Sequence, residues 1–351
     1  MLTHKITKIS AIEQSQLSEF YKKIYFNRHK SLINNWRWWY RHGYSKYEPL
    51  IILSNEKVIG QAGIQPVDLK INNEKFSGVW FLDFAILPEF RGKGFGKILT
   101  KKLMEACPHI ITFCNKKTLS MVKNFGWKQN TNDKSSLVDL SISRLAKPIN
   151  PLKFIPILNK FDLKFIDTAF RKKSRKKLFP LDLDKPIIQP KKIEVNYNVI
   201  SESFKKIKVI NIKNQPEILR DEQWLYWRVM ECPYKKDLYF FEYKNNFAIV
   251  HIFSNKGIKR LNILFSYFVD EEHYSGLFSL IMSWSIDNKI DFVWAIKRVT
   301  TEVEHCFENR FKKPLIYASW SSDKNIFEIL KNGPTNVEGI DSDIDSSLFI
   351  E

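Results

Sequence analysis

The chain has few cysteines, and their spacing excludes the sites that cysteine most often builds. There are four among 351 residues: Cys107, Cys114, Cys232 and Cys306. None forms a C-x-x-C pair, and the seven histidines show no H-E-x-x-H or similar grouping. The sequence therefore predicts no zinc site, no catalytic metal and no disulfide framework. Scattered reduced thiols are typical of a cytoplasmic protein.

Long apolar runs are also missing. No stretch of about eighteen apolar residues occurs, and residues 1–5 contain no apolar segment of the kind that directs secretion. Neither secretion nor membrane spanning is predicted. The length and an apolar content of 44% are nevertheless sufficient for two domains, each with its own core.

Acidic residues are outnumbered, because 38 Asp and Glu stand against 56 Lys and Arg and give a formal charge of +18. Such a balance raises the question of a nucleic-acid partner. The excess is spread along the chain, however, and its densest run covers only residues 171–177. This run is predicted to be either a solvated face of a linker or a contact to a phosphate or nucleotide.

Among the residues that are present, the segment 79–106 has the clearest pattern. Residues 79–87 are apolar and aromatic over a length that favours a buried strand, and Pro88 ends it. After a glycine-rich loop at residues 91–96, apolar residues recur at helical spacing as far as Ala106. A strand, a glycine loop and a helix aim backbone N–H groups and the positive end of a helix dipole at one point, which suits a diphosphate.

The glycine spacing discriminates between phosphate loops. A dinucleotide loop, G-x-G-x-x-G, would need glycine where Lys97 stands, and a P-loop would need glycine where Arg91 stands. The spacing instead fits [QR]-x-x-G-x-[GA], with Arg91, Gly94 and Gly96 at the fixed positions. A glycine-rich turn can also be a tight connection that binds nothing.

Residues 91–96 resemble the coenzyme A loop of the GNAT N-acyltransferase superfamily. The resemblance continues through a strand at residues 109–114, Asn115, and a helix that ends in Phe125-Gly126-Trp127. It implies acyl-CoA as co-substrate, whose phosphates would suit a basic chain without any nucleic acid. The cofactor-binding residues that it implies are Phe84, Ala85, Ile86, Arg91, Gly92, Lys93, Gly94, Phe95, Gly96, Lys97 and Asn115.

The resemblance implies an α/β (α+β) fold with two tandem GNAT-like domains, each a mixed, mostly antiparallel sheet flanked by helices. Residues 1–140 are predicted to form the domain with the acyl-CoA site, residues 141–195 a basic connector that contains several prolines, and residues 196–351 a degenerate GNAT-like domain that binds the acceptor. The repeat rests on the similarity of residues 36–39 to residues 224–227. In the second copy, Asp-Glu-Glu-His at residues 270–273 replaces the glycine loop, so we expect one coenzyme A per chain.

A tandem GNAT chain with one cofactor site resembles bacterial acyltransferases of nucleotide-linked amino sugars, such as dTDP-amino-dideoxyhexoses, for surface polysaccharide. The resemblance implies direct attack of a sugar amine on the thioester of an acetyl or a longer, hydroxylated acyl group. Two alternatives stay open: a Fem-like transferase that uses aminoacyl-tRNA, and a GNAT enzyme that acts on a peptide or protein amine. The expected partners are small-molecule substrates, without nucleic acid or a membrane span, for a monomer or a dimer.

The catalytic residues are less well defined. The family's general-acid tyrosine falls at Val122, so no acid is assigned. Asp83, the carboxylate of the strand that would carry the thioester, is a candidate base or else a buried hydrogen-bonding residue. The acidic residues 341–345 are predicted to be a solvated tail or a domain contact. The candidate acceptor contacts are Trp36, Trp39 and Gln65. Each could instead have a core or structural role.

Overall fold

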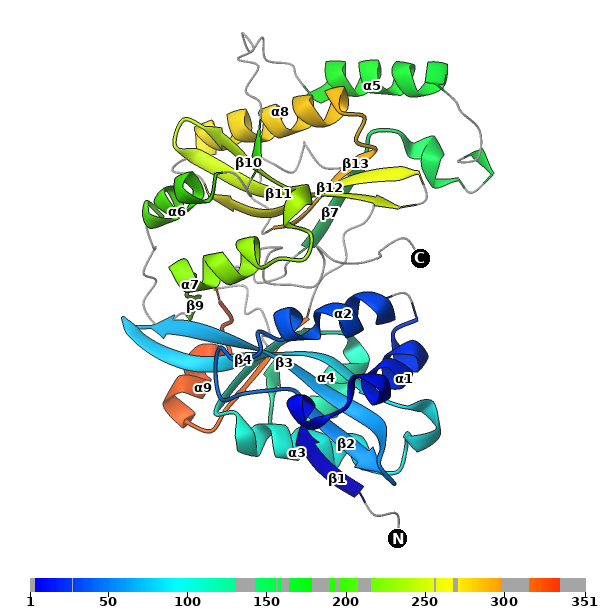
Figure 1. Ribbon diagram of the computed structural model, residues 1–351. Coiled ribbons are helices and arrows are strands. Elements are labelled where there is room, and N and C mark those ends of the chain that lie inside the picture. Colours follow the sequence, from blue (N-terminus) through cyan, green and yellow to red (C-terminus); the bar gives the residue numbers. More distant parts are fainter. Residues whose placement is uncertain are drawn as a thin grey trace.

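The chain folds around two β-sheets, each covered by helices (Figure 1). The computed structural model describes residues 4–26, 28–129, 143–155, 157–158, 164–178, 190–192, 196–207, 216–255, 257–267, 271–297 and 316–334. Cys306, Asp270 and the acidic residues 341–345 therefore lie outside the described residues.

The first sheet is mixed and mostly antiparallel, with strand order β1-β2-β3-β4-β5-β14-β6 and with β9 paired to β3. Its strands are β1 (His4–Lys8), β2 (Leu50–Ser54), β3 (Lys57–Ile71), β4 (Glu74–Ile86), β5 (His109–Cys114), β6 (Lys128–Gln129), β9 (Glu217–Ile218) and β14 (Ile316–Ser321). Its helices are α1 (Gln14–Ile24), α2 (His29–Trp39), α3 (Phe95–Ala106), α4 (Lys116–Lys123) and α9 (Lys324–Leu330), with short 3-10 turns η1 (Ile9–Ala11) and η2 (Pro88–Phe90).

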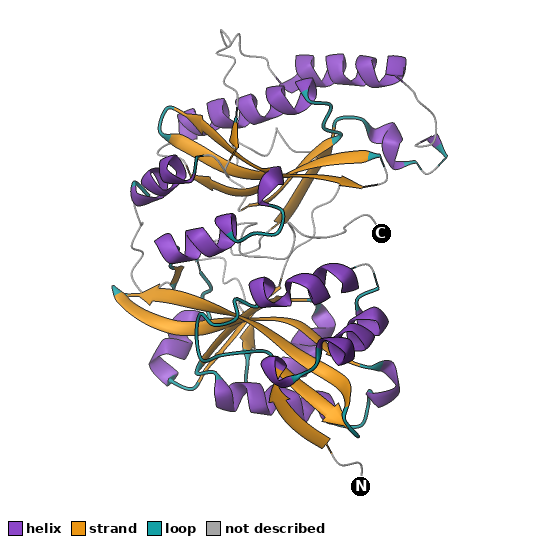
Figure 2. Cartoon of the chain, in the orientation of Figure 1, coloured by secondary structure: helices purple, strands orange, loops and turns teal. Residues whose placement is uncertain are grey.

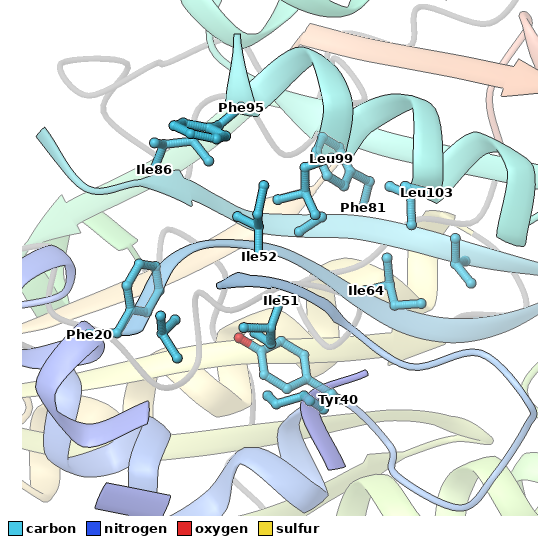
Figure 3. Packing of buried hydrophobic residues seen from close by; sticks show 14 of the residues in the cluster. Phe20, Tyr40, Ile51, Ile52, Ile64, Phe81, Ile86, Phe95, Leu99 and Leu103 are labelled. Atoms are coloured by element: carbon cyan, nitrogen blue, oxygen red, sulfur yellow. The ribbon is translucent and has the colours of Figure 1, made fainter. Parts of the chain in front are cut away.

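The core of this half lies on both faces of the sheet. Phe95, Leu99 and Leu103 of α3 pack on one face, and Phe20 and Tyr40 lie on the other (Figure 3). All five side chains are less than a tenth exposed. Because both faces are covered, β3 reads as a nearly continuous buried run over residues 58–64 instead of an alternating one.

The second sheet has strand order β7-β13-β12-β11-β10-β8. Its strands are β7 (Ser143–Pro148), β8 (Lys191–Lys192), β10 (Leu238–Tyr243), β11 (Asn246–Asn255), β12 (Ile258–Tyr267) and β13 (Phe292–Lys297). Its helical segments are η3 (Pro151–Phe154), α5 (Lys164–Leu178), α6 (Tyr197–Lys205), α7 (Glu222–Leu225), the π-helical turn η6 (Tyr226–Met230), η7 (Lys235–Asp237) and α8 (Glu271–Asp287). Helices α5 and α8 lie on the face turned away from the first sheet, whereas α6 and α7 lie on the face turned toward it (Figure 2).

The two sheets repeat one arrangement. In the first, β3 and β4 form an antiparallel pair, and α3 connects β4 to the parallel strand β5. In the second, β11 and β12 form the antiparallel pair, and α8 connects β12 to the parallel strand β13. The fold class expected from the sequence, an α/β chain with two GNAT-like sheets flanked by helices, is confirmed.

The last strand of each repeat lies in the other repeat's sheet. Strand β7 follows β6 along the chain but pairs antiparallel with β13 of the second sheet. Strand β14 follows the second sheet but pairs antiparallel with β5 of the first. The sheets therefore do not divide at the predicted boundaries: the connector 141–195 supplies β7 and β8 to the second sheet, and the C-terminal segment supplies β14 and α9 to the first half.

Two local differences from the sequence-based expectation have simple causes. A proline is usually excluded from the interior of a strand, yet β3 runs through Pro66. It can do so because β2 pairs with β3 only as far as Ala62, and a residue without an N–H is tolerated on the open edge. Arg171, the first residue of the basic run, is buried and ion-paired with Asp167 and Asp291, so it is neither a solvated nor a phosphate-binding side chain.

Candidate active site

The glycine loop leads directly into helix α3. Gly92 and Gly94 have φ angles of 76° and 83°, a backbone conformation that side chains rarely adopt. Gly94 is the N-cap of α3, and the first intrahelical bond runs from the amide of Ile98 to the carbonyl of Gly94. The amides of the three residues between them have no intrahelical acceptor, so they can donate to an anion.

Two side chains hold this loop against strand β4. Phe95 is 6% exposed and packs edge-on against Phe90, which fixes the start of the helix. Arg91 Nε donates to the carbonyl of Ile86 at 3.0 Å. Lys93 and Lys97 remain exposed beside the loop. The loop therefore has fixed amides and exposed cations, an arrangement that can hold a diphosphate.

Strands β4 and β5 diverge below the loop. Their parallel ladder contains two residue pairs, Val79 with Ile110 and Trp80 with Ile111, and the Thr112 hydroxyl then donates to the carbonyl of Phe81 at 2.7 Å. From there β4 continues along β3 and β5 continues along β14. Strand edges that part in this way expose backbone groups to an incoming extended molecule, and we call this place the β4–β5 divergence.

A β-bulge in β4 lies beside the divergence. Gln61 pairs with Ala85, and the next paired residue, Gly63, is opposite Leu82, so the ladder skips Asp83 and Phe84. Asp83 takes a φ of 47°, which is strained for a residue with a side chain. A Cβ on Gly63 would lie 2.6 Å from the carbonyl oxygen of Leu82, so the bulge requires glycine opposite it.

The Asp83 carboxylate is the centre of a buried hydrogen-bond network. Oδ2 accepts from the indole of Trp39 at 2.9 Å and from the hydroxyl of Tyr40 at 3.2 Å. Arg28 Nη2 lies 3.3 Å from both carboxylate oxygens, and the Asp83 side chain is only 6% exposed. This arrangement matches the buried hydrogen-bonding alternative for Asp83, because the oxygens that a base would need already accept from three donors.

A second layer of the network holds the backbone of the bulge. Tyr25 donates to the carbonyl oxygen of Asp83 at 2.8 Å. The Gln61 amide accepts from Tyr21 at 2.8 Å and donates to Tyr40 at 2.6 Å. Burial raises the pKa of the Tyr21 and Tyr40 hydroxyls, so both stay protonated at ordinary pH and can donate.

The candidate acceptor residues differ in burial and in hydrogen-bond partners. Trp36 and Trp39 are 8% and 6% exposed, so both rings pack mainly in the core. Trp39 also lines a small pocket beside α2. Gln65 is half-buried, and its amide donates to the carbonyl of Trp39 at 2.8 Å. Asn115 caps helix α4 by accepting from the amide of Thr118 at 2.9 Å.

A small pocket separates α2 from the second half of the chain. Its volume is about 30 Å³, and its lining includes Arg28, Asn35, Trp38 and Tyr234. Arg28 connects this pocket to Asp83 and hence to the β4–β5 divergence. Sequence reasoning missed Arg28 and Tyr234, because no motif contains either residue and only the folded chain brings them together.

A thiol near the divergence is not prepared for covalent chemistry. Cys114 ends β5 and packs against the first core. Burial raises the pKa of its thiol to about 11, so the nucleophilic thiolate is scarce near neutral pH. Cys114 is therefore not an activated nucleophile.

Comparison with known proteins gives the class of the chain, an N-acyltransferase, and enzymes of the matching family use acyl-CoA. Residues 9–127, about a third of the chain, match the acetyltransferase (GNAT) family. The match is confined to these residues and gives the chain its enzyme class, N-acyltransferase. A search of curated protein sequences returns no match.

Solved structures share the fold over nearly the whole chain. A GCN5-related N-acetyltransferase from Kribbella flavida has 9% identity and a TM-score of 0.57, over 91% of this chain and 71% of its own. N-myristoyltransferase of Saccharomyces cerevisiae with bound myristoyl-CoA has 11% identity and a TM-score of 0.56, and the alignment covers 91% of this chain and 82% of that one. A fungal GCN5-related glucosamine N-acetyltransferase region has 10% identity and a TM-score of 0.53, and the alignment covers 91% of this chain and 38% of that one. At these identities the likeness shows the fold alone.

Two features are absent from the part of the chain that the structure describes. No group of three or more His, Cys, Asp or Glu side chains there could hold a metal ion. Within the same part of the chain, no helix is both long and apolar enough to cross a membrane.

Proposed function

We propose that the protein transfers an acyl group from coenzyme A to the amino group of a nucleotide-linked amino sugar. The observation that carries the acyl-transfer part is the glycine loop above the β4–β5 divergence. The amides of Phe95, Gly96 and Lys97 would hold the diphosphate, and the backbone of residues 84–86 would hold the pantetheine arm. Coenzyme A would supply the thioester, and the chain supplies orientation and hydrogen-bond donors.

The backbone of Ile86 is the part of β4 that would contact the pantetheine arm. The amide of Leu87 donates to Ile59 of β3, so the backbone of the preceding residue points toward the divergence. Arg91 already occupies the carbonyl of Ile86. The amide of Ile86 would therefore be the group presented to the pantetheine arm.

The network around Asp83 would position the reacting groups. Because Trp39, Tyr40 and Arg28 already contact the carboxylate, its role in this proposal is to fix the bulge and Arg28. An amine with a pKa near about 8 is about one-tenth neutral at pH 7, so deprotonating it costs only about 1.4 kcal/mol and needs no strong base. The burial of the site would favour the neutral amine further.

The acceptor class is supported by the pocket between α2 and the second half. Asn35 and Tyr234 offer polar groups for a sugar there, and Arg28 adds a guanidinium that is paired with Asp83. At about 30 Å³ the pocket would hold only one edge of such a ligand. The fungal glucosamine N-acetyltransferase region also shares the fold. The peptide-amine alternative is supported by the similarity to N-myristoyltransferase, so the test includes both acceptors.

Thermal melting with ligands tests the proposal first. Coenzyme A should raise the melting temperature by mass action, and one of dTDP, UDP or GDP should raise it further. Asn35→Ala, at a pocket residue outside the Asp83 network, should reduce the nucleotide shift and keep the coenzyme A shift. Absence of any coenzyme A shift would refute the acyltransferase site itself.

Release of free thiol from acetyl-CoA identifies the acceptor. Amino sugars linked to the stabilising nucleotide should give turnover, and the free amino sugars should give much less. Turnover with an N-terminal glycine peptide and none with any nucleotide sugar would replace the sugar proposal by the peptide alternative.

A further inference from the structure

Large apolar side chains are exposed in one part of the molecule more than elsewhere. Eight such side chains are exposed among the described residues, and five of them come from residues 154–166. These five are Phe154, Ile155, Ile157, Phe165 and Ile166. Phe165 is the most exposed, at 87%. Scattered apolar residues on a surface are ordinary, but a concentration of this kind indicates a contact surface.

The two segments that carry these side chains are fixed to each other by buried charges. The Asp291 carboxylate is fully buried and accepts from Arg171 of α5 at 3.1 Å and from Lys153 of η3 at 3.0 Å. Asn150, just before η3, also donates to Asp167 of α5 at 2.6 Å. The exposed side chains therefore project from an anchored platform, which we call the η3–α5 face.

The outward side of α5 combines apolar and cationic groups. Asp167 and Arg171 point inward, since both contact the body of the second half. Phe165 and Lys172 are seven positions apart and so lie on one line of the opposite side, with exposed Thr168 between them. Lys173 is exposed next to this line.

The charge of this region has one sign. Residues 151–178 contain nine lysines and arginines and two aspartates. One of the aspartates, Asp167, is paired with Arg171. In Figure 1, α5 lies on the side of the second sheet that faces away from the first sheet, so a partner bound there would leave the glycine loop accessible.

We propose that the η3–α5 face binds the surface of an anionic lipid bilayer. Exposed phenylalanine and isoleucine side chains can enter the boundary between headgroups and acyl chains, and lysines beside them attract anionic headgroups. A nucleic acid would need the cations but not the apolar side chains. The combination of both, on a chain with a formal charge of +18, favours the bilayer. This contact is peripheral and independent of the acyl-transfer proposal.

Vesicle flotation tests the proposal with the full chain. The protein should float with vesicles of phosphatidylcholine and phosphatidylglycerol, and much less with phosphatidylcholine alone. Phe165→Asp and the double variant Lys172→Glu, Lys173→Glu should each lower the bound fraction by about tenfold or more. Because these side chains are exposed, the melting temperature and its shift with coenzyme A should not change.

Matched variants elsewhere separate a specific face from general charge attraction. Phe26→Asp after α1 and Lys22→Glu, Lys23→Glu on α1 make the same chemical changes at other exposed positions and should keep binding. No binding to anionic vesicles would overturn the proposal. An equal loss of vesicle binding with the matched variants would also overturn it. If only the lysine variants lowered vesicle binding and the protein bound heparin tightly, the face would instead be a nucleic-acid surface.

Discussion

At the scale of single residues, Asp83 shows how position decides the role of a carboxylate. A carboxylate on the strand beside a thioester is a candidate base on sequence grounds. In the folded chain its oxygens accept from Trp39, Tyr40 and Arg28, and its backbone is held in a strained conformation by the bulge. Strain of this kind persists only where the surroundings fix it, so the network is expected to maintain the geometry of the divergence.

Replacement of Asp83 by asparagine distinguishes a positioning role from a base. Asp83→Asn removes the ion pair with Arg28 and should lower the free energy of unfolding by about 1–3 kcal/mol. If Asp83 positions the backbone of the bulge, kcat should fall by a similar factor at every pH, and the shape of the pH–rate profile should be kept. Loss of the acidic limb of that profile would instead identify a base. Asp237→Asn, at an exposed carboxylate, is the matched control.

Gly96 gives a graded test of the loop. A Cβ there would lie 3.5 Å from Phe84, which is an ordinary contact, so Gly96→Ala should keep coenzyme A binding within about twofold. Gly96→Asp adds a charge beside the diphosphate and a larger group against Phe84, and should weaken binding by at least about tenfold. Calorimetric titration with coenzyme A measures both. Equal affinities for the two variants would refute the placement of the diphosphate.

Asp68 provides a prediction about pH and stability. Burial opposes the charge of Asp68, but hydrogen bonds from Tyr44 and Lys75 outweigh it and hold the pKa below its ordinary value. A depressed pKa contributes stability above the unfolded value of about 3.9, and this contribution is lost as pH falls through the folded pKa.

Asp68→Asn should therefore destabilise the protein at neutral pH by about 1–2 kcal/mol, with little difference from the parent at the most acidic pH at which the protein stays folded. Urea denaturation at several pH values measures the difference. A difference that does not change with pH would show that the charge of Asp68 is not involved.

At the scale of elements, the sequence predicts local structure better than it predicts long-range strand pairing. The run of residues 79–87 and the glycine loop define β4 and the start of α3, because burial and backbone conformation are local properties. The bulge at Asp83 and the partners of its carboxylate could not be predicted, since they depend on Arg28, Trp39 and Tyr40 arriving from α2 and its flanks. The pairing of β14 with β5 joins residues about two hundred positions apart, and no local signal encodes it.

Two tryptophans join the halves in a reciprocal contact. The indole of Trp38 donates to the carbonyl of Trp227, and the indole of Trp227 donates to the carbonyl of Trp38, each at 3.0 Å. Reciprocity is what a two-fold relation between repeats produces, so Trp38 and Trp227 are equivalent positions. The similarity of residues 36–39 to residues 224–227 therefore holds with a shift of one residue.

A double-mutant cycle tests this contact. Trp38→Phe and Trp227→Phe each remove one hydrogen bond and part of the shared ring packing, so their effects on the free energy of unfolding should couple by about 0.5–1.5 kcal/mol. Trp38→Phe with Trp80→Phe is the control, since Trp80 packs on Phe113 in another cluster, and those two effects should add. Additivity in both pairs would refute the reciprocal contact.

At the scale of the whole molecule, the exchange of β7 and β14 makes each half depend on the other. Each sheet is completed by a strand that comes from beyond the other half of the same chain. Ala318 of β14 is fully buried between β5 and β6 in the core below the glycine loop. A change at Ala318 should consequently affect coenzyme A binding, although it lies more than two hundred residues from the loop.

Ala318→Asp places an unpaired charge in that core and should cost about 3–5 kcal/mol of unfolding free energy. The melting temperature and the coenzyme A shift should fall together, because the first sheet loses its strand beside β5. Asn325→Asp, exposed in the first turn of α9, changes the charge equally a few residues away and should leave both unchanged. If a fragment of residues 1–140 melted cooperatively and bound coenzyme A as tightly as the full chain, β14 would be dispensable and the exchange would have no energetic consequence.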